Sequence, residues 1–240
     1  MLSLLAFLFL AYQPDSAEAI YIQEEIRHRF PGGEVEVHRR DIWIGKNEVR
    51  VEREEDNEKK SIIFVPLRQA FYVVNHTRKS YYYVLTGRDR QLQRLPFYGL
   101  APFNNGVFSK PPRLLFPTNQ SRRISRWQCD EFQLKYPNQS GVTTTVWVTK
   151  EPTPLDNNSL KRFWYTMLGT TNIHYDVRYI FNRLVEDMQG TPIRTVTTIE
   201  QEEMRLTTVS TILTLERRRT PYEDFFSIPS TYQLEVREDE

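Results

Sequence analysis

The residue types that carry out most enzyme chemistry occur in this chain without the spacing that such chemistry needs. Four histidines are present, His28, His38, His76 and His174. They form neither an i,i+4 pair nor an H-x-E motif, so no metal site is indicated. No G-x-S-x-G or S-x-x-K motif and no Cys/His pair offers a nucleophile. Neighbouring carboxylates such as Asp130 and Glu131 point to opposite faces of a strand. We therefore predict no catalytic residue, no cofactor and no metal.

Cys129 is the only cysteine, so stability cannot come from internal disulfides. Its surroundings, Trp127–Phe132, begin with the alternation of a strand, which favours a buried and inert thiol. An intermolecular disulfide and a reactive thiol are the alternatives, although no nearby base or second cysteine is available to activate the sulfur.

Composition limits the class of partner. The chain carries 32 basic and 31 acidic residues, so it has no overall field that would attract nucleic acid or an anionic membrane. Hydrophobic residues make up 39% and charged residues 26%, which is enough for one real core. The triplet Tyr81-Tyr82-Tyr83 could stack on bases, but no basic stripe accompanies it. We predict a globular protein that does not bind nucleic acid.

The first nineteen residues have the order of a secretory leader. An apolar run, Leu2–Tyr12, is followed by Pro14 and by Ala17-Glu18-Ala19. The run is shorter than the roughly 20 apolar residues that span a membrane. We predict a signal peptide at residues 1–19, cleavage near Ala19, and a periplasmic or other cell-envelope location for residues 20–240, with no transmembrane span in the mature chain. An uncleaved anchor and a misassigned start codon are the alternatives.

Strands dominate the elements that must position any site. Alternating apolar and polar residues around short turns predict hairpins in an antiparallel meander. The expected strand pairs are Ile42–Ile44 with Val49–Val51, Ala70–Val74 with Tyr81–Leu85, Arg126–Tyr136 with Gly141–Lys150, and Ile193–Ile199 with Met204–Glu216. The segment Ile20–Phe30 is ambiguous between strand and helix.

Residues 86–123 interrupt this rhythm. Five prolines deny a regular helix or a central strand, and the many aromatic residues argue against a linker. We interpret this Pro/aromatic-rich block as a packed loop at the mouth or edge of the sheet, with room for one short helix near Arg90–Leu95.

Two amphipathic stripes at helical spacing follow. The first consists of Leu160, Phe163, Trp164, Met167 and Leu168, and the second of Val177, Ile180, Phe181, Leu184, Val185 and Met188. Each predicted helix is too short to be stable unless it packs on something.

The order of these features is also familiar. The chain resembles a group of exported bacterial proteins of unknown function in the order of five features. These are the piece Ile124–Phe132, a strand ending Trp147-Val148-Thr149, two helices, Gly190–Ile193 and the ending Phe226–Tyr232. That group is similar in fold to the lipoprotein-localisation factors LolA and LolB. The resemblance covers most of residues 20–236 and implies an α+β fold, in which a strongly curved antiparallel sheet, an unclosed barrel, has helices covering its concave face. It also implies an apolar cavity able to hold acyl chains.

Eight residues are candidates to line such a cavity. They are Trp43, Trp127, Trp147, Phe163, Trp164, Ile180, Phe181 and Leu184. Trp43 alternates with Ile42 and Ile44 along its strand, so its side chain is expected on the opposite face. Ordinary core packing is the alternative for all eight residues. If the helices fill the concavity the result is a core, and if they leave room it is a lipid site.

Three functions follow from this picture. The first is a non-enzymatic exported protein that binds a lipid or a lipoprotein acyl chain between the curved sheet and the helices. The second is an envelope module with a filled core that binds a protein partner through a sheet edge or the Pro/aromatic-rich block. The third is an enzyme with an unrecognised site, which a cleft with converging polar groups would indicate.

Overall fold

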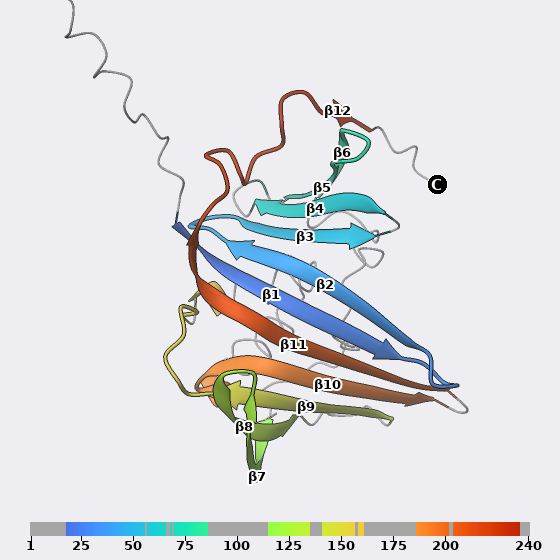
Figure 1. Cartoon of the computed structure of the whole chain (residues 1–240), viewed down its shortest axis with the longest axis vertical. Helices are drawn as coiled ribbons and strands as arrows, with labels where there is room; N and C mark the ends of the chain where they lie inside the picture. The colour runs from blue at the N-terminus through green and yellow to red at the C-terminus, as the bar shows by residue number, and fades with distance from the viewer. Residues whose placement is uncertain are drawn as a thin grey trace, which may run out of the picture.

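The computed structural model describes residues 18–55, 57–65, 68, 70–85, 115–134, 141–156, 158–160, 186–201 and 204–235. They form one open, strongly curved sheet (Figure 1). Its strands are β1 (Glu18–Arg29), β2 (Val35–Ile44), β3 (Val49–Glu55), β4 (Glu58–Val65), β5 (Ala70–Asn75), β6 (Ser80–Leu85), β7 (Leu115–Ile124), β8 (Trp127–Leu134), β9 (Val142–Thr149), β10 (Thr191–Gln201), β11 (Met204–Arg219) and β12 (Gln233–Leu234).

Two meanders make up the sheet. Strands β1 to β6 follow one another in chain order on one side, and β7 to β11 do the same on the other. The two meanders join where β1 pairs antiparallel with β11 over almost its whole length, with a bulge between Gln23 and Glu24. The short strand β12 adds in parallel to the outer side of β6. The curved antiparallel sheet expected from the sequence is therefore confirmed.

The predicted hairpins also form. In the β2–β3 turn, the amide of Gly45 donates to the carbonyl of Glu48 at 2.9 Å. The β5–β6, β8–β9 and β10–β11 pairs match the strand pairs expected from alternation. The segment that was ambiguous in the sequence is strand β1, near the middle of the sheet.

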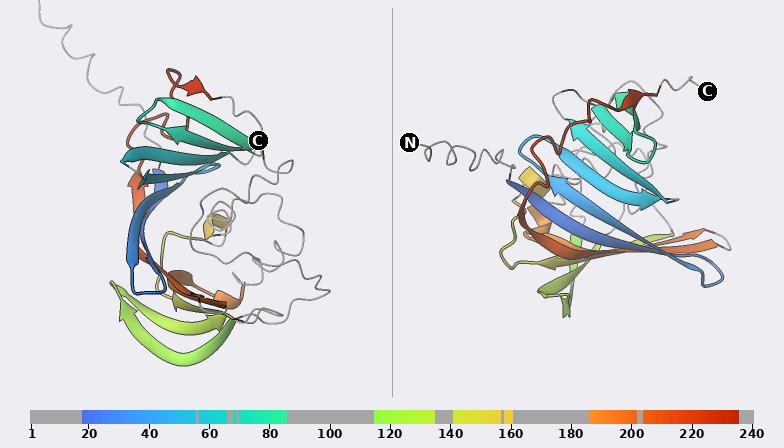
Figure 2. Two further views of the ribbon diagram at one scale, coloured as in Figure 1. Left: turned by 90° about the vertical axis from the view of Figure 1, so that its right-hand side faces the viewer. Right: turned by 45° about the horizontal axis from the view of Figure 1, so that its top comes forward.

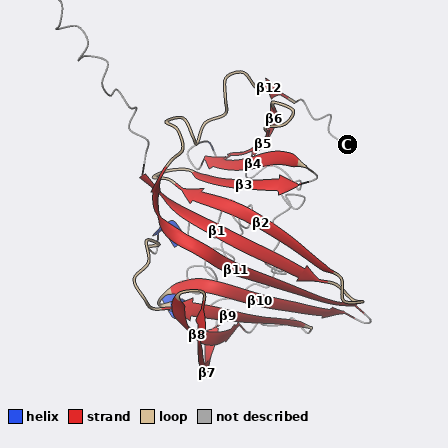
Figure 3. Ribbon diagram, viewed as in Figure 1, coloured by secondary structure: helices blue, strands red, loops and turns tan. Residues whose placement is uncertain are grey.

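The α+β class, with helices covering the concave face, is wrong. Of the described residues, 68% are strand and 5% helical, and no helix among them covers the sheet (Figure 3). The described α-helical residues are 158–160 and 186–188, while most of both predicted helices, 161–185, lies outside the described residues. The reason is physical: a 3.6-residue period shows which side chains share a helix face, but not how much of the chain strand pairing will occupy.

The Pro/aromatic-rich block also departs from expectation at its end. Residues 86–114, including the short helix considered near Arg90–Leu95, lie outside the described residues, but residues 115–124 form strand β7 rather than a loop. β7 is the edge of the sheet and contains Pro117, followed by an irregularity in its pairing before Ser121. An edge strand tolerates proline because one side of its backbone has no ladder partner.

At the N-terminus, residues 1–17 lie outside the described residues, so the signal peptide stays a prediction. β1 begins at Glu18, and Ala19 is buried and pairs with Arg218. Among the described residues, no helix has the length and apolar character needed to cross a membrane.

Candidate functional site

The concave face of the first meander carries two continuous rows of apolar side chains. Cross-strand partners in an antiparallel sheet lie on the same face, so the pairing register defines the rows. Row A consists of Ile20, Ile44, Val49, Phe64 and Phe71. Row B consists of Leu215, Ile22, Ile42, Val51, Ile62 and Val73.

Both rows belong to the main core. Every member except the partly buried Val73 is buried, and the Phe64 and Phe71 rings stack with centroids 4.7 Å apart. Leu155, Leu160 and Met188 join the same cluster. The helical turn that contains Leu160 lies on the hollow side of the sheet, which identifies rows A and B as its concave face (Figure 2).

One step further along the strands the same face becomes polar. Row C consists of Glu24, Arg40, Arg53, Lys60 and Asn75. Arg40 Nε donates to the Glu24 carboxylate at 2.5 Å, both side chains are largely buried, and the Ser210 hydroxyl donates to the other Glu24 oxygen. The concave face is thus amphipathic along the strand direction, with two apolar rows followed by a charged one.

A pocket of about 670 Å³ lies at the other end of the sheet, between β7, β8 and the helical turn at 186–188. Its apolar part is formed by Pro117, Phe132 and Met188, of which the last two also belong to the main core. Asp130 and Lys150, which form a 3.3 Å ion pair, lie at its polar rim.

Of the predicted cavity residues, the structure describes three, and it places two of them in the main core and the third elsewhere. Trp127 and Trp147 are buried in the main core, with the guanidinium of Arg126 stacked 4.8 Å from the Trp127 ring and that of Arg122 4.0 Å from the Trp147 ring. Trp43 lies on the convex face in a separate cluster. Phe163, Trp164, Ile180, Phe181 and Leu184 lie outside the described residues and stay predictions.

The convex cluster contains a segment whose role the sequence did not reveal. Residues 220–235, here called the C-terminal strap, cross the back of the first meander (Figure 2). Phe225 is buried there against Trp43, with ring centroids 5.0 Å apart, beside Ala19 and Tyr21. The Tyr21 hydroxyl donates to Asp41 at 2.8 Å, and burial is the largest cause that raises the pKa of Tyr21 to about 12.

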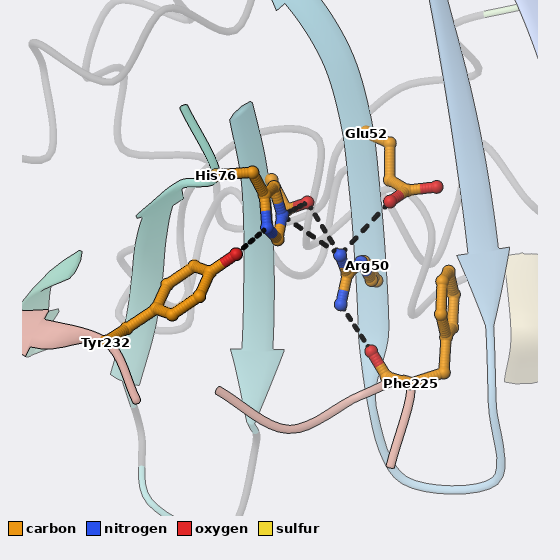
Figure 4. A network of polar contacts seen from close by, with 6 residues as sticks. Arg50, Glu52, His76, Phe225 and Tyr232 are labelled. Atoms are coloured by element: carbon orange, nitrogen blue, oxygen red, sulfur yellow. Dashed lines mark hydrogen bonds and ion pairs between the residues drawn. The ribbon is translucent and has the colours of Figure 1, made fainter. Parts of the chain in front are cut away.

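A polar network fixes the strap to the strands (Figure 4). Arg50 is only 1% exposed and donates to the Phe225 carbonyl. Its guanidinium carbon lies 4.4 Å from the centroid of the Phe225 ring. Its Nη2 lies 3.1 Å from a Glu52 oxygen, 2.9 Å from Ser61 Oγ and 3.1 Å from Nε2 of His76, so three acceptors share two N–H groups. Because Nε2 accepts, the ring proton lies on Nδ1 and is donated to the Tyr232 hydroxyl at 3.0 Å.

The Ser61–His76 contact, 2.7 Å long, superficially resembles a nucleophile with its base. Ser61 is however completely buried and also accepts from Arg50, so a substrate has no access to its hydroxyl. Burial, followed by the charges of Arg50 and Lys59, lowers the pKa of His76 to about 4. The arrangement is therefore a neutral histidine that holds structure together.

Two further groups fit inert roles. Cys129 is fully buried as expected, and burial raises the pKa of its thiol to about 11. Burial also lowers the pKa of His28, whose Nδ1 lies 3.0 Å from the Thr208 hydroxyl. In the part of the chain that the structure describes, no group of three or more His, Cys, Asp or Glu side chains is placed to hold a metal ion.

The sequence matches no family model and no curated protein. Among solved structures, an uncharacterised conserved protein from Thermus thermophilus is 9% identical, with 92% of this chain and 91% of that chain covered and a TM-score of 0.45. A chain of the MucA/MucB complex of Pseudomonas aeruginosa is 12% identical, with 91% of this chain and 58% of that chain covered and a TM-score of 0.42. LolA superfamily protein NE2245 from Nitrosomonas europaea is 12% identical, with 88% of this chain and 90% of that chain covered and a TM-score of 0.35.

The chain spans only part of some of these proteins, 58% of the matched chain in the MucA/MucB complex and 31% of PNGF-II. A LolA superfamily protein and an outer membrane lipoprotein-sorting domain from Vibrio parahaemolyticus are both among the matches. LolA-like proteins, which the sequence was noted to resemble, are thus among the matches, at 10–12% identity and TM-scores of 0.22–0.35. Similarity at this level does not transfer a function.

Proposed function

We propose that this chain is an exported, non-enzymatic protein that binds an apolar ligand, a lipid or a lipoprotein acyl chain, on the concave face of its sheet. The observation that carries the proposal is the continuity of rows A and B, in which eleven neighbouring positions on six strands are all aliphatic or aromatic. Rows A and B are already buried in the folded chain, so an acyl chain would have to replace the side chains that cover them, and each Å² of apolar contact it makes is worth about 25 cal/mol.

The experiment compares two residues that are neighbours in β4. Ile62 belongs to row B, whereas Ile63 is equally buried on the opposite face. Ile62→Ala and Ile63→Ala remove the same number of carbon atoms from a buried position, so their cost in stability is matched. We expect Ile62→Ala to weaken binding of a fluorescent fatty acid about tenfold, which corresponds to about 1.4 kcal/mol, and Ile63→Ala to change it less than twofold.

Mass spectrometry of organic extracts from the gently purified full chain provides an independent check, and bound lipid is the expected result. If the two alanine variants weaken binding equally, the concave face is not the site. If the extracts contain no lipid and the fatty acid does not bind, the proposal fails.

The alternative, an interaction module that uses a sheet edge, has less support. One edge strand, β7, contains Pro117, a pairing irregularity and the exposed cations Arg122 and Arg123, all of which discourage the addition of another strand. At the edge of β6, β12 of the same chain pairs with Ser80 and Tyr81, the first two of its six residues. A partner that binds through residues 86–114 stays a hypothesis.

A further inference from the structure

Two arginines flank a tryptophan ring on the convex side of the second meander. Arg194 on β10 is the direct cross-strand partner of Trp147 on β9, so their Cβ atoms lie about 4.5–5.5 Å apart on one face. The guanidinium carbon of Arg122, from β7, lies 4.0 Å from the centroid of the same indole ring. We propose that Arg122 and Arg194, here called the arginine pair, bind a phosphate group, either free or on a small soluble ester.

The pairing register gives the face on which this site lies. A single row runs across β1, β11, β10, β9 and β8, and its members are Glu25, Thr211, Arg194, Trp147 and Glu131. Glu25 neighbours Glu24 of row C in β1 and therefore lies on the opposite, convex face. The site is thus separate from rows A and B, and the inference goes beyond the proposed function.

Arg194 is a donor that lacks an acceptor. Its side chain is partly buried, and its Nε is buried without a hydrogen-bond partner in the part of the chain that the structure describes. Burial is the largest cause that lowers the pKa of Arg194, followed by the positive charges of Arg122 and Arg27. A buried charge without a partner is costly. An anion bound here would supply the missing acceptor and offset the repulsion between the guanidinium groups.

The carboxylates in the same row are bonded to other groups. Glu25 forms ion pairs with Arg27 at 2.6 Å and with Arg39 at 2.9 Å. Glu131 accepts a hydrogen bond from the Thr118 hydroxyl at 2.9 Å.

Two more carboxylates, Asp130 and Glu151, act on Cys129, the cross-strand partner of Arg122. Asp130 forms an ion pair with Lys150 at 3.3 Å, and Glu151 accepts from a backbone amide at 2.8 Å. Among the described residues, no carboxylate forms an ion pair with either member of the arginine pair.

The chemistry of two guanidinium groups favours phosphate over carboxylate. Each guanidinium presents a planar fork of donors that matches two oxygens. A phosphate monoester carries a charge of about −1.5 to −2 at pH 7 and three terminal oxygens, so it can accept from both arginines, whereas a carboxylate has one charge and two oxygens. Arg122 is exposed, so a ligand can approach the pair from solvent.

The test is calorimetric titration of the full chain with inorganic phosphate, glycerol 3-phosphate and acetate, at one ionic strength of about 0.15 M, where the screening length is about 8 Å. We expect inorganic phosphate to bind at least ten times more tightly than acetate. Arg194→Gln and Arg122→Gln should each weaken phosphate binding about tenfold. Binding of glycerol 3-phosphate with similar affinity identifies an ester as the ligand, and its failure to bind identifies the free ion.

A second measurement covers effects of the variants on folding. Because a ligand that binds only the folded chain stabilises it, phosphate should raise the thermal midpoint of the wild type and raise that of Arg194→Gln less.

The matched control is Arg123→Gln. Arg123 follows Arg122 in β7 and is also exposed, but it lies on the other face of the strand. Its loss should change phosphate affinity less than twofold. The inference is overturned if the wild type does not bind phosphate, if acetate binds equally well, or if Arg123→Gln and Arg122→Gln weaken binding to the same extent. None of these results would affect fatty-acid binding on the concave face, so the proposed function is tested separately.

Discussion

At the scale of single residues, Arg50 organises the convex face. A buried charge is tolerated where donors find acceptors, and the two terminal nitrogens of Arg50 lie within hydrogen-bond distance of Glu52, Ser61, His76 and the Phe225 carbonyl. The planar guanidinium also packs on the Phe225 ring. A lysine at this position would retain the charge, but a single ammonium group cannot meet acceptors in so many directions.

We predict that Arg50→Lys lowers the free energy of unfolding by about 2–3 kcal/mol, because at least one buried acceptor loses its hydrogen bond. Urea denaturation followed by circular dichroism measures the change. Arg39→Lys, at a 68% exposed side chain, should alter stability by less than about 0.5 kcal/mol. Similar values for the two variants would show that the Arg50 network contributes little.

At the scale of elements, the C-terminal strap acts as a cover for Tyr21 and Trp43. Phe225 is buried in one cluster with these two residues. The ring of Phe226 comes so close to the β2–β3 turn that a Cβ on Gly45 would lie 2.8 Å from it. The turn therefore has a glycine where the Phe226 ring lies against it. The strap ends by adding β12 to β6, which covers the first two residues of that edge strand, Ser80 and Tyr81.

We predict that Phe225→Ala costs about 3–4 kcal/mol of stability, as large-to-small changes in a core do, and exposes Trp43 to solvent. Acrylamide quenching of tryptophan fluorescence should increase in Phe225→Ala, and the increase should disappear when Trp43→Phe is added. Phe226→Ala, at a partly buried position, should have a smaller effect on both measurements. An increase in quenching that persists without Trp43 would contradict this account.

The same elements show how far the sequence could lead. Alternation and turn residues predicted most of the hairpins, because a period of two and a short polar turn are local properties of the chain. Local patterns could not predict that β1 pairs with β11, nearly 190 residues away, or that Pro117 would lie in an edge strand.

The site was less accessible to sequence analysis than the fold. Trp43 was grouped with the cavity residues by its type, although its parity already placed it on the other face of its strand. Row C becomes visible only once the register is known, since Arg40, Arg53 and Lys60 come from three different strands. In the C-terminal strap, the aromatic pair Phe225-Phe226 was the one feature of the sequence that indicated burial. Nothing in the sequence indicated that Arg50 and His76 would bind the strap.

At the scale of the whole molecule, stability should depend on pH in two separate ranges. His76 and His28 have folded-state pKa values below the usual 6.5, so protonation favours the unfolded chain. Their contribution is complete above pH 6.5 and is lost as the pH falls; for His76 this loss continues to about pH 4. Carboxylates with lowered pKa values, such as Glu25 and Asp130, contribute above about pH 4.5 and lose their effect only at lower pH.

We predict that the urea midpoint of the wild type decreases between pH 6.5 and 4.5, before the carboxylates titrate, and that His76→Gln decreases less over this range. The variant should be less stable at pH 7, because glutamine cannot reproduce both the acceptor that faces Arg50 and the donor that faces Tyr232. The informative quantity is the slope of the urea midpoint against pH, because a purely structural defect would lower the midpoint equally at every pH. Parallel curves for wild type and variant would show that His76 does not link the strap to proton uptake, and the decrease would then have to come from His28.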